Sequence, residues 1–157
     1  MDWEHLTRMV LLGSESVEPL AKLLVRVLLG IFFAISGGYK LFVPSRARSM
    51  YNTLVEAGVP SPRIMAWFVS AVEFVGGCLL IVGLMSTLAS LALLVDMVIA
   101  VLTNKLFTMP KKLSLLDWID DFLYLPEVLY ILFFVWLIGS GPGRFSVDYL
   151  IAMHLAK

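Results

Sequence analysis

Residues 20–43 read LAKLLVRVLLGIFFAISGGYKLFV, an apolar run with Arg26 inside it and Lys40 near its end. A helix needs about 20 residues to cross about 30 Å of hydrocarbon, so this run is long enough to span a membrane. Three further apolar runs follow at 64–84, 86–107 and 122–139. The sequence therefore predicts an all-α membrane protein, built as a four-transmembrane-helix antiparallel bundle with short interfacial helices.

The composition agrees with this assignment. The chain is 60% hydrophobic and has a mean hydropathy of +0.91, whereas soluble domains are about 45–50% apolar. Four spans in 157 residues leave almost nothing for a soluble domain, so we predict a single membrane domain over 1–157. The formal net charge of zero gives no argument for a nucleic-acid partner.

The segments between the spans are predicted to be short and interfacial. Residues 83–87 leave no room for a loop, so the second and third spans form a tight hairpin. Ser45 is predicted to cap a short amphipathic helix that ends near Ala57. The other predicted elements are an N-terminal interfacial segment over 1–19, an interfacial loop over 44–63, a loop over 108–121 and an amphipathic tail over 140–157. Lysines and arginines are more numerous on the side of the loops 44–63 and 108–121 than on the side of the two termini. This bias favours a cytoplasmic position for the loops and an outside position for both termini.

Each apolar run contains an ionisable residue, and these are Arg26, Glu73, Asp96 and Glu127. A charge near mid-bilayer costs at least about 2.5–3.5 kcal/mol, so each side chain should face the bundle interior and find a partner. Glu73 and Asp96 lie at similar distances from the 83–87 turn and should share one depth. Arg26 enters from the same side, so we predict that it pairs with both carboxylates.

Lys40 and Glu127 are expected near the opposite surface, and we predict that they pair. One cation against two carboxylates suggests that one carboxylate holds a proton or meets another donor. Two interpretations stay open: a salt-bridge network that fixes helix register, or a polar cavity for a headgroup, a quinone or protons. The candidate cavity and ligand-binding residues are Arg26, Lys40, Glu73, Asp96 and Glu127.

The residues beside these charges are expected to shape the cavity. Glycines 30, 37, 76 and 77 should let helices approach closely and leave room next to the charges. Five aromatic residues are candidates for its walls: Phe33, Tyr39, Phe74, Tyr124 and Tyr130.

Redox and metal chemistry find little support in the sequence. Cys78 is the single cysteine, whereas a membrane thiol–quinone enzyme needs a pair, and we predict that Cys78 is a small core residue. His5 and His154 lie outside the four spans, so a haem between two transmembrane histidines is not available. We expect no metal site, and no catalytic residue is identified.

Several motifs occur in an order and spacing typical of one family. The first run contains R-x-x-x-G at 26–30 and S-G-x-x-K-L at 36–41, and L-x-x-x-G-V-P follows at 54–60. Later come E-F-V-G-G at 73–77, Glu127, and G-x-G-x-G-R-F-S-V-D at 139–148. Together they resemble the DoxX family. Asp96, Pro126 and the N-terminal extension are not part of that pattern.

The founding members of that family look like the small membrane subunit of a thiosulfate:quinone oxidoreductase, and relatives of similar fold act as membrane chaperones or assembly factors. The resemblance implies an accessory subunit of a quinone-linked redox complex or another envelope complex, in the bacterial cytoplasmic membrane. Its partners would be other membrane subunits or a second copy. No covalent cofactor is implied, so a partner, or a bound quinone or lipid, supplies what the chain lacks. The alternatives are a structural or assembly subunit without a ligand and a proton-linked small-solute transporter.

Overall fold

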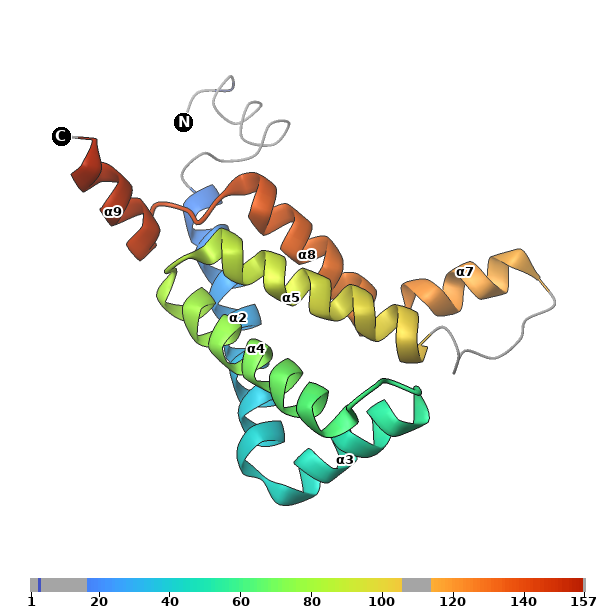
Figure 1. The fold of residues 1–157 in the computed structure, drawn as a ribbon. Coiled ribbons are helices and arrows are strands. Elements are labelled where there is room, and N and C mark those ends of the chain that lie inside the picture. Colours follow the sequence, from blue (N-terminus) through green and yellow to red (C-terminus); the bar gives the residue numbers. More distant parts are fainter. Residues whose placement is uncertain (1–2, 4–16, 106–113, 157) are drawn as a thin grey trace.

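The computed structural model describes Trp3, residues 17–105 and residues 114–156, and every regular element in these residues is a helix (Figure 1). The predicted interfacial segment 1–19 lies mostly outside the described residues, as does the first part of the predicted loop 108–121. The all-α fold class predicted from the sequence is confirmed.

Three helices are long and apolar enough to cross a membrane. They are α2 (Glu18–Phe42), α4 (Pro62–Val82) and α5 (Ser86–Ala100), which one π-helical turn, η1 (Val101–Lys105), extends. Between α4 and α5 the chain reverses through Gly83 and Met85, both with positive φ. The predicted tight hairpin is therefore present.

The fourth predicted span differs from its expected form. Instead of a loop over 108–121 and a helix from 122, the chain forms α7 (Leu115–Leu123) and α8 (Pro126–Ser140). The two helices are bent by 65° and together count as a possible fourth span. Leu125 is extended because the following proline disfavours a helical conformation there. Figure 1 shows α7 projecting away from α8.

Short helices lie at both ends of the bundle (Figure 1). Helix α3 (Pro44–Glu56) packs against α2 and α4, at the position predicted for an interfacial helix. Ser45 does not cap it. The N-cap is Val43, whose extended conformation is favoured by Pro44 and also ends α2. At the other end of the bundle, Ser146 caps α9 (Val147–Leu155) in the predicted tail.

Glycines bring α2 and α4 into backbone contact. A Cβ added at Gly37 would lie 2.7 Å from the carbonyl oxygen of Ser70, and one at Gly30 would lie 2.8 Å from that of Gly77. Gly76 faces the side chain of Leu93 on α5. The predicted close approach of the helices is confirmed. The prediction that these glycines leave free space is wrong, because atoms of the neighbouring helices occupy that space.

Two of the predicted wall residues pack in the core instead. Phe33 on α2 is buried and meets Tyr130 and Phe134 of α8 at ring-centroid distances of 5.4 and 5.3 Å. Tyr39 and Tyr124 are exposed, and Phe74 contacts Phe42. None of the five aromatic residues lines the cavity described below.

Cys78 also differs from its prediction. It is a free thiol on the exposed side of α4, not a core residue, because the buried face of this helix carries Ser70, Glu73, Gly76, Gly77 and Leu80.

Candidate functional site

The two interior cations of α2 lie on one face but at opposite ends of the bundle. Arg26, Gly30, Phe33 and Gly37 are buried along this face, as the periodicity predicts, and Lys40 follows three residues later. Fourteen residues of helix separate Arg26 from Lys40, which is about 21 Å. The two side chains therefore belong to separate environments.

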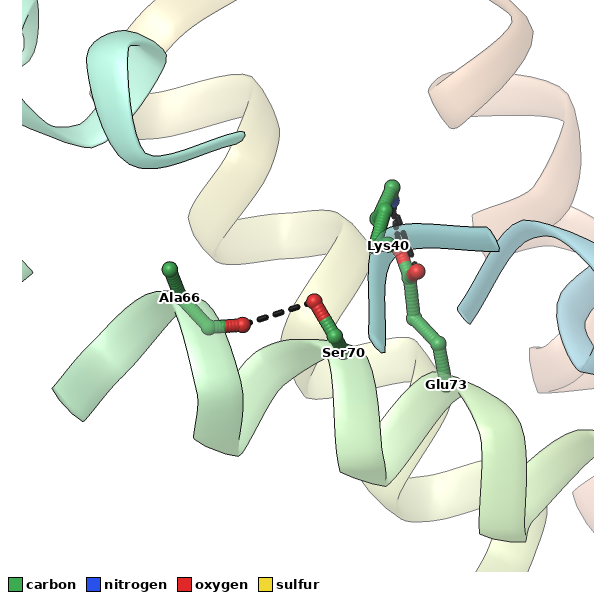
Figure 2. A network of polar contacts seen from close by, with 4 residues as sticks. All are labelled: Lys40, Ala66, Ser70 and Glu73. Carbon is green, nitrogen blue, oxygen red and sulfur yellow. Dashed lines mark hydrogen bonds and ion pairs between the residues drawn. The ribbon is translucent and has the colours of Figure 1, made fainter. Parts of the chain in front are cut away.

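Lys40 forms an ion pair with Glu73 (Figure 2). The ammonium Nζ lies 2.6 Å from both Oε1 and Oε2, so the contact is bidentate on the carboxylate. The side chain of Glu73 is 4% exposed, whereas that of Lys40 is 27% exposed. One turn before Glu73, the buried Ser70 hydroxyl donates to the carbonyl oxygen of Ala66 at 2.6 Å. The Glu73 carboxylate is thus enclosed by protein, whereas the Lys40 side chain that pairs with it is partly exposed at the surface.

This ion pair overturns both pairings predicted from helix depth. Lys40 pairs with Glu73 rather than Glu127, and Arg26 donates to two backbone carbonyls, those of Pro142 at 2.6 Å and Phe145 at 2.6 Å. The register of α2 on α4 explains the difference. Gly37 meets Ser70 and Glu73, so the guanidinium of Arg26 reaches the level of Gly83, where it lies beside the turn.

The segment 140–148 packs around Arg26 at one end of the bundle. We call its contacts with Arg26 and with the turn at 83–86 the C-terminal latch. The Asp148 carboxylate accepts from the backbone N–H groups of Met85 at 2.7 Å and Ser86 at 2.8 Å, and its own N–H donates to Gly83. Burial of Asp148 opposes ionisation, but the hydrogen bonds from Ser86 and Met85 outweigh it and lower the pKa below its usual 3.8. The motif over 139–148 thus serves to attach the C-terminal segment.

Asp96 and Glu127 complete the set of interior charges. Asp96 lies on α5, which packs against α4, the helix that carries Glu73. The buried Oδ2 of Asp96 has no hydrogen-bond partner among the described residues. In the part of the chain that the structure describes, Lys40 forms an ion pair with Glu73 and with no other carboxylate. Glu127 lies in the first turn of α8 and is half-buried.

A cavity of about 860 Å³ opens beside Lys40, between the end of α2, α3 and the start of α4; we call it the interfacial pocket. Ser70 lies on its inner wall. The polar and aromatic side chains that line it are Lys40, Arg48, Tyr51, Ser61, Arg63, Trp67 and Ser70. Apolar residues such as Leu41, Met50 and Ile64 complete the lining. Of the five candidates for a cavity, only Lys40 reaches this pocket, and Glu73 is coupled to it through the ion pair.

Four charged or aromatic residues of this pocket were not predicted from the sequence, and these are Arg48, Tyr51, Arg63 and Trp67. Arg48 and Tyr51 belong to the predicted interfacial loop, and Trp67 follows closely on the start of a span. Aromatic and basic residues next to a span are typical of the membrane–water interface. This signal was present, but it gave no reason for these side chains to converge.

Comparisons with known proteins agree with the motifs. The DoxX family model matches residues 21–106, which include most of α2, all of α3 to α5 and every lining residue of the interfacial pocket. The chain is also 29% identical to an uncharacterised membrane protein of Mycobacterium tuberculosis (strain ATCC 25618 / H37Rv) over 133 residues, 83% of this chain and 80% of the relative. No solved structure matches the chain. The family model covers more than half of the sequence, and the protein belongs to the DoxX family.

Proposed function

We propose that this protein is an accessory subunit of a membrane complex, redox and quinone-linked or another envelope complex, and that its interfacial pocket holds the polar head of an amphiphile. The observation that carries the proposal is the position of Lys40. It neutralises the enclosed Glu73 and also lines a cavity of about 860 Å³ at the end of the bundle.

The chemistry of the pocket suits the head of an amphiphile. Ligand sites are commonly cavities of about 300–1,000 Å³ with apolar walls and a few polar groups that fix orientation. Here three of the polar groups are cationic, and Tyr51 and Trp67 provide aromatic surface. A quinone carbonyl or a lipid headgroup would accept hydrogen bonds from Lys40, while Glu73 holds the lysine in place.

A redox role needs a second component. The chain has a single cysteine, and no cluster that could hold a metal ion is present among the described residues. Electrons would therefore pass through a bound quinone or a partner subunit, and this chain would supply the site in which the head of the amphiphile is held. We place such a complex in the bacterial cytoplasmic membrane.

The test is purification of the tagged full-length chain from native membranes, followed by identification of the co-purifying subunits and extracted amphiphiles. The informative variant is Ala47→Phe, which fills the pocket from α3 and leaves the Lys40–Glu73 pair intact. We expect this variant to lose the enriched amphiphile while the helices still assemble. A matched control is Ala21→Phe, on the exposed side of α2 at the opposite end. If wild-type protein carries no amphiphile above its bulk abundance in the membrane, the ligand proposal is wrong.

A structural or assembly role is the second candidate, and the latch favours it. Arg26 is buried and, within the described ranges 17–105 and 114–156, donates only to backbone carbonyls of the C-terminal segment, so at this end the buried charge fixes the fold. If Ala47→Phe retains every partner and all activity in cells while latch variants lose both, the structural role is the better account.

A further inference from the structure

We infer that the amphiphile of the interfacial pocket is an anionic lipid, whose phosphate-type head lies among Lys40, Arg48 and Arg63. This inference rests on the proposed function and specifies its ligand class. Ligands of this class have an oxyanion head and apolar chains. They differ from a neutral quinone, which has no anionic head, and from a free inorganic anion, which has no apolar chains.

The charges on the pocket wall carry the first step. Its lining contains three cationic side chains and no carboxylate. Lys40 is already paired with Glu73, but in the described part of the chain neither Arg48 nor Arg63 takes part in an ion pair. Two arginines from different helices therefore face one cavity without a counter-charge. A neutral quinone in the pocket would leave both arginines without a counter-charge.

The position of these residues in the fold gives the second step. Lys40 is in the last turn of α2, Arg48 is on α3, and Arg63 is in the first turn of α4. The end of α2, the helix α3 and the start of α4 thus converge where the apolar spans stop, which is the level of lipid headgroups. The planar guanidinium matches a phosphate by two parallel hydrogen bonds, so arginine is the side chain suited to this contact.

The apolar lining decides between a lipid and a free anion. Leu41, Met50 and Ile64 line the same cavity as the arginines, and Trp67 adds an indole. A small inorganic anion would make no use of this surface, whereas acyl chains leaving the headgroup would cover it. The pocket therefore has one part suited to an oxyanion and another suited to hydrocarbon.

The experiment uses the full-length protein in a neutral detergent, with phosphatidylglycerol titrated and bound lipid counted by native mass spectrometry. The parallel ligands are phosphatidylcholine, decylubiquinone and inorganic phosphate. The variants are Arg48→Gln and Arg63→Gln, and the matched control is Arg46→Gln, which is exposed on the same helix but does not line the pocket. Each lining variant should weaken phosphatidylglycerol binding about fivefold, and the double variant about twentyfold, if each basic group near the membrane surface contributes as usual.

Each outcome decides the inference. Selective binding of phosphatidylglycerol that is lost in the lining variants and kept in Arg46→Gln supports it. Equal loss in Arg46→Gln would indicate diffuse surface charge and overturn it, as would equal binding of inorganic phosphate. If decylubiquinone saturates the pocket and phosphatidylglycerol does not, the anionic ligand is wrong but the proposed function stands. If no amphiphile binds, both are wrong.

Discussion

The two ends of α2 use a buried cation in different ways. At the latch end, Arg26 is 1% exposed and donates to two backbone carbonyls, and the segment 140–148 covers it. At the pocket end, Lys40 pairs with a side-chain carboxylate and is 27% exposed. A buried cation whose hydrogen bonds go to backbone carbonyls is fixed by the fold, whereas one that borders a cavity can also meet a ligand. Burial of a charge inside a membrane protein therefore does not by itself mark a site.

The largest effect is expected from Arg26→Gln, which tests the closed end. Removal of the guanidinium takes its donors from two part-buried carbonyls, at up to about 1–3 kcal/mol each, and leaves a gap where a buried side chain packed, so we expect a loss of about 3–5 kcal/mol. Folded yield and thermal unfolding in detergent measure it. Adding Glu73→Gln should give no recovery, because Glu73 pairs with Lys40. Recovery in the double variant would mean that the two ends are coupled.

Gly37→Ala tests the seam that places Lys40 over Glu73. The new Cβ would lie 2.7 Å from the Ser70 carbonyl oxygen. The helix backbone cannot move aside as a side chain can, so overpacking should cost about 2–3 kcal/mol. The matched control is Gly38→Ala, whose Cβ would meet only the Phe74 ring, at 3.4 Å. Thermal unfolding of the two variants should differ clearly, and equal stability would show that the helices are not in backbone contact.

Lys40→Met tests the open end. It leaves the 4% exposed carboxylate of Glu73 without its partner. Truncating one member of a buried pair typically costs about 3–5 kcal/mol, and we expect about 2 kcal/mol because Lys40 is partly exposed and solvent screens the pair. Adding Glu73→Gln should recover part of the loss, in contrast to Arg26→Gln. The absence of any recovery would show that the ion pair does not contribute to stability.

The sequence predicted the first three spans, the inward face of α2 and the tight hairpin, because hydropathy and periodicity determine these features. It failed on the partners of Arg26 and Lys40. Depth counted from helix ends assumes that the ends are level, but glycine contacts determine the register of α2 on α4. Backbone carbonyls such as those that bind Arg26 occur at every residue, so no pattern marks them. The interfacial pocket was missed because its arginines converge only when α3 packs on α4.

The smallest effect concerns the acid sensitivity of the C-terminal latch. In Asp148→Asn one acceptor remains for the two N–H groups at the start of α5, so we expect a loss of about 1 kcal/mol at pH 7. The pKa of Asp148 is lowered in the folded state, so its stabilisation is complete above the unfolded value and is lost as the pH falls through the folded value. The stability difference between wild type and Asp148→Asn should therefore shrink below about pH 4.

Ser146→Ala removes the neutral cap of α9 and should give a difference from wild type that does not depend on pH. Thermal unfolding between pH 7 and pH 3 measures both, and a difference for Asp148→Asn that stays constant across this range would show that the charge of Asp148 does not hold the latch.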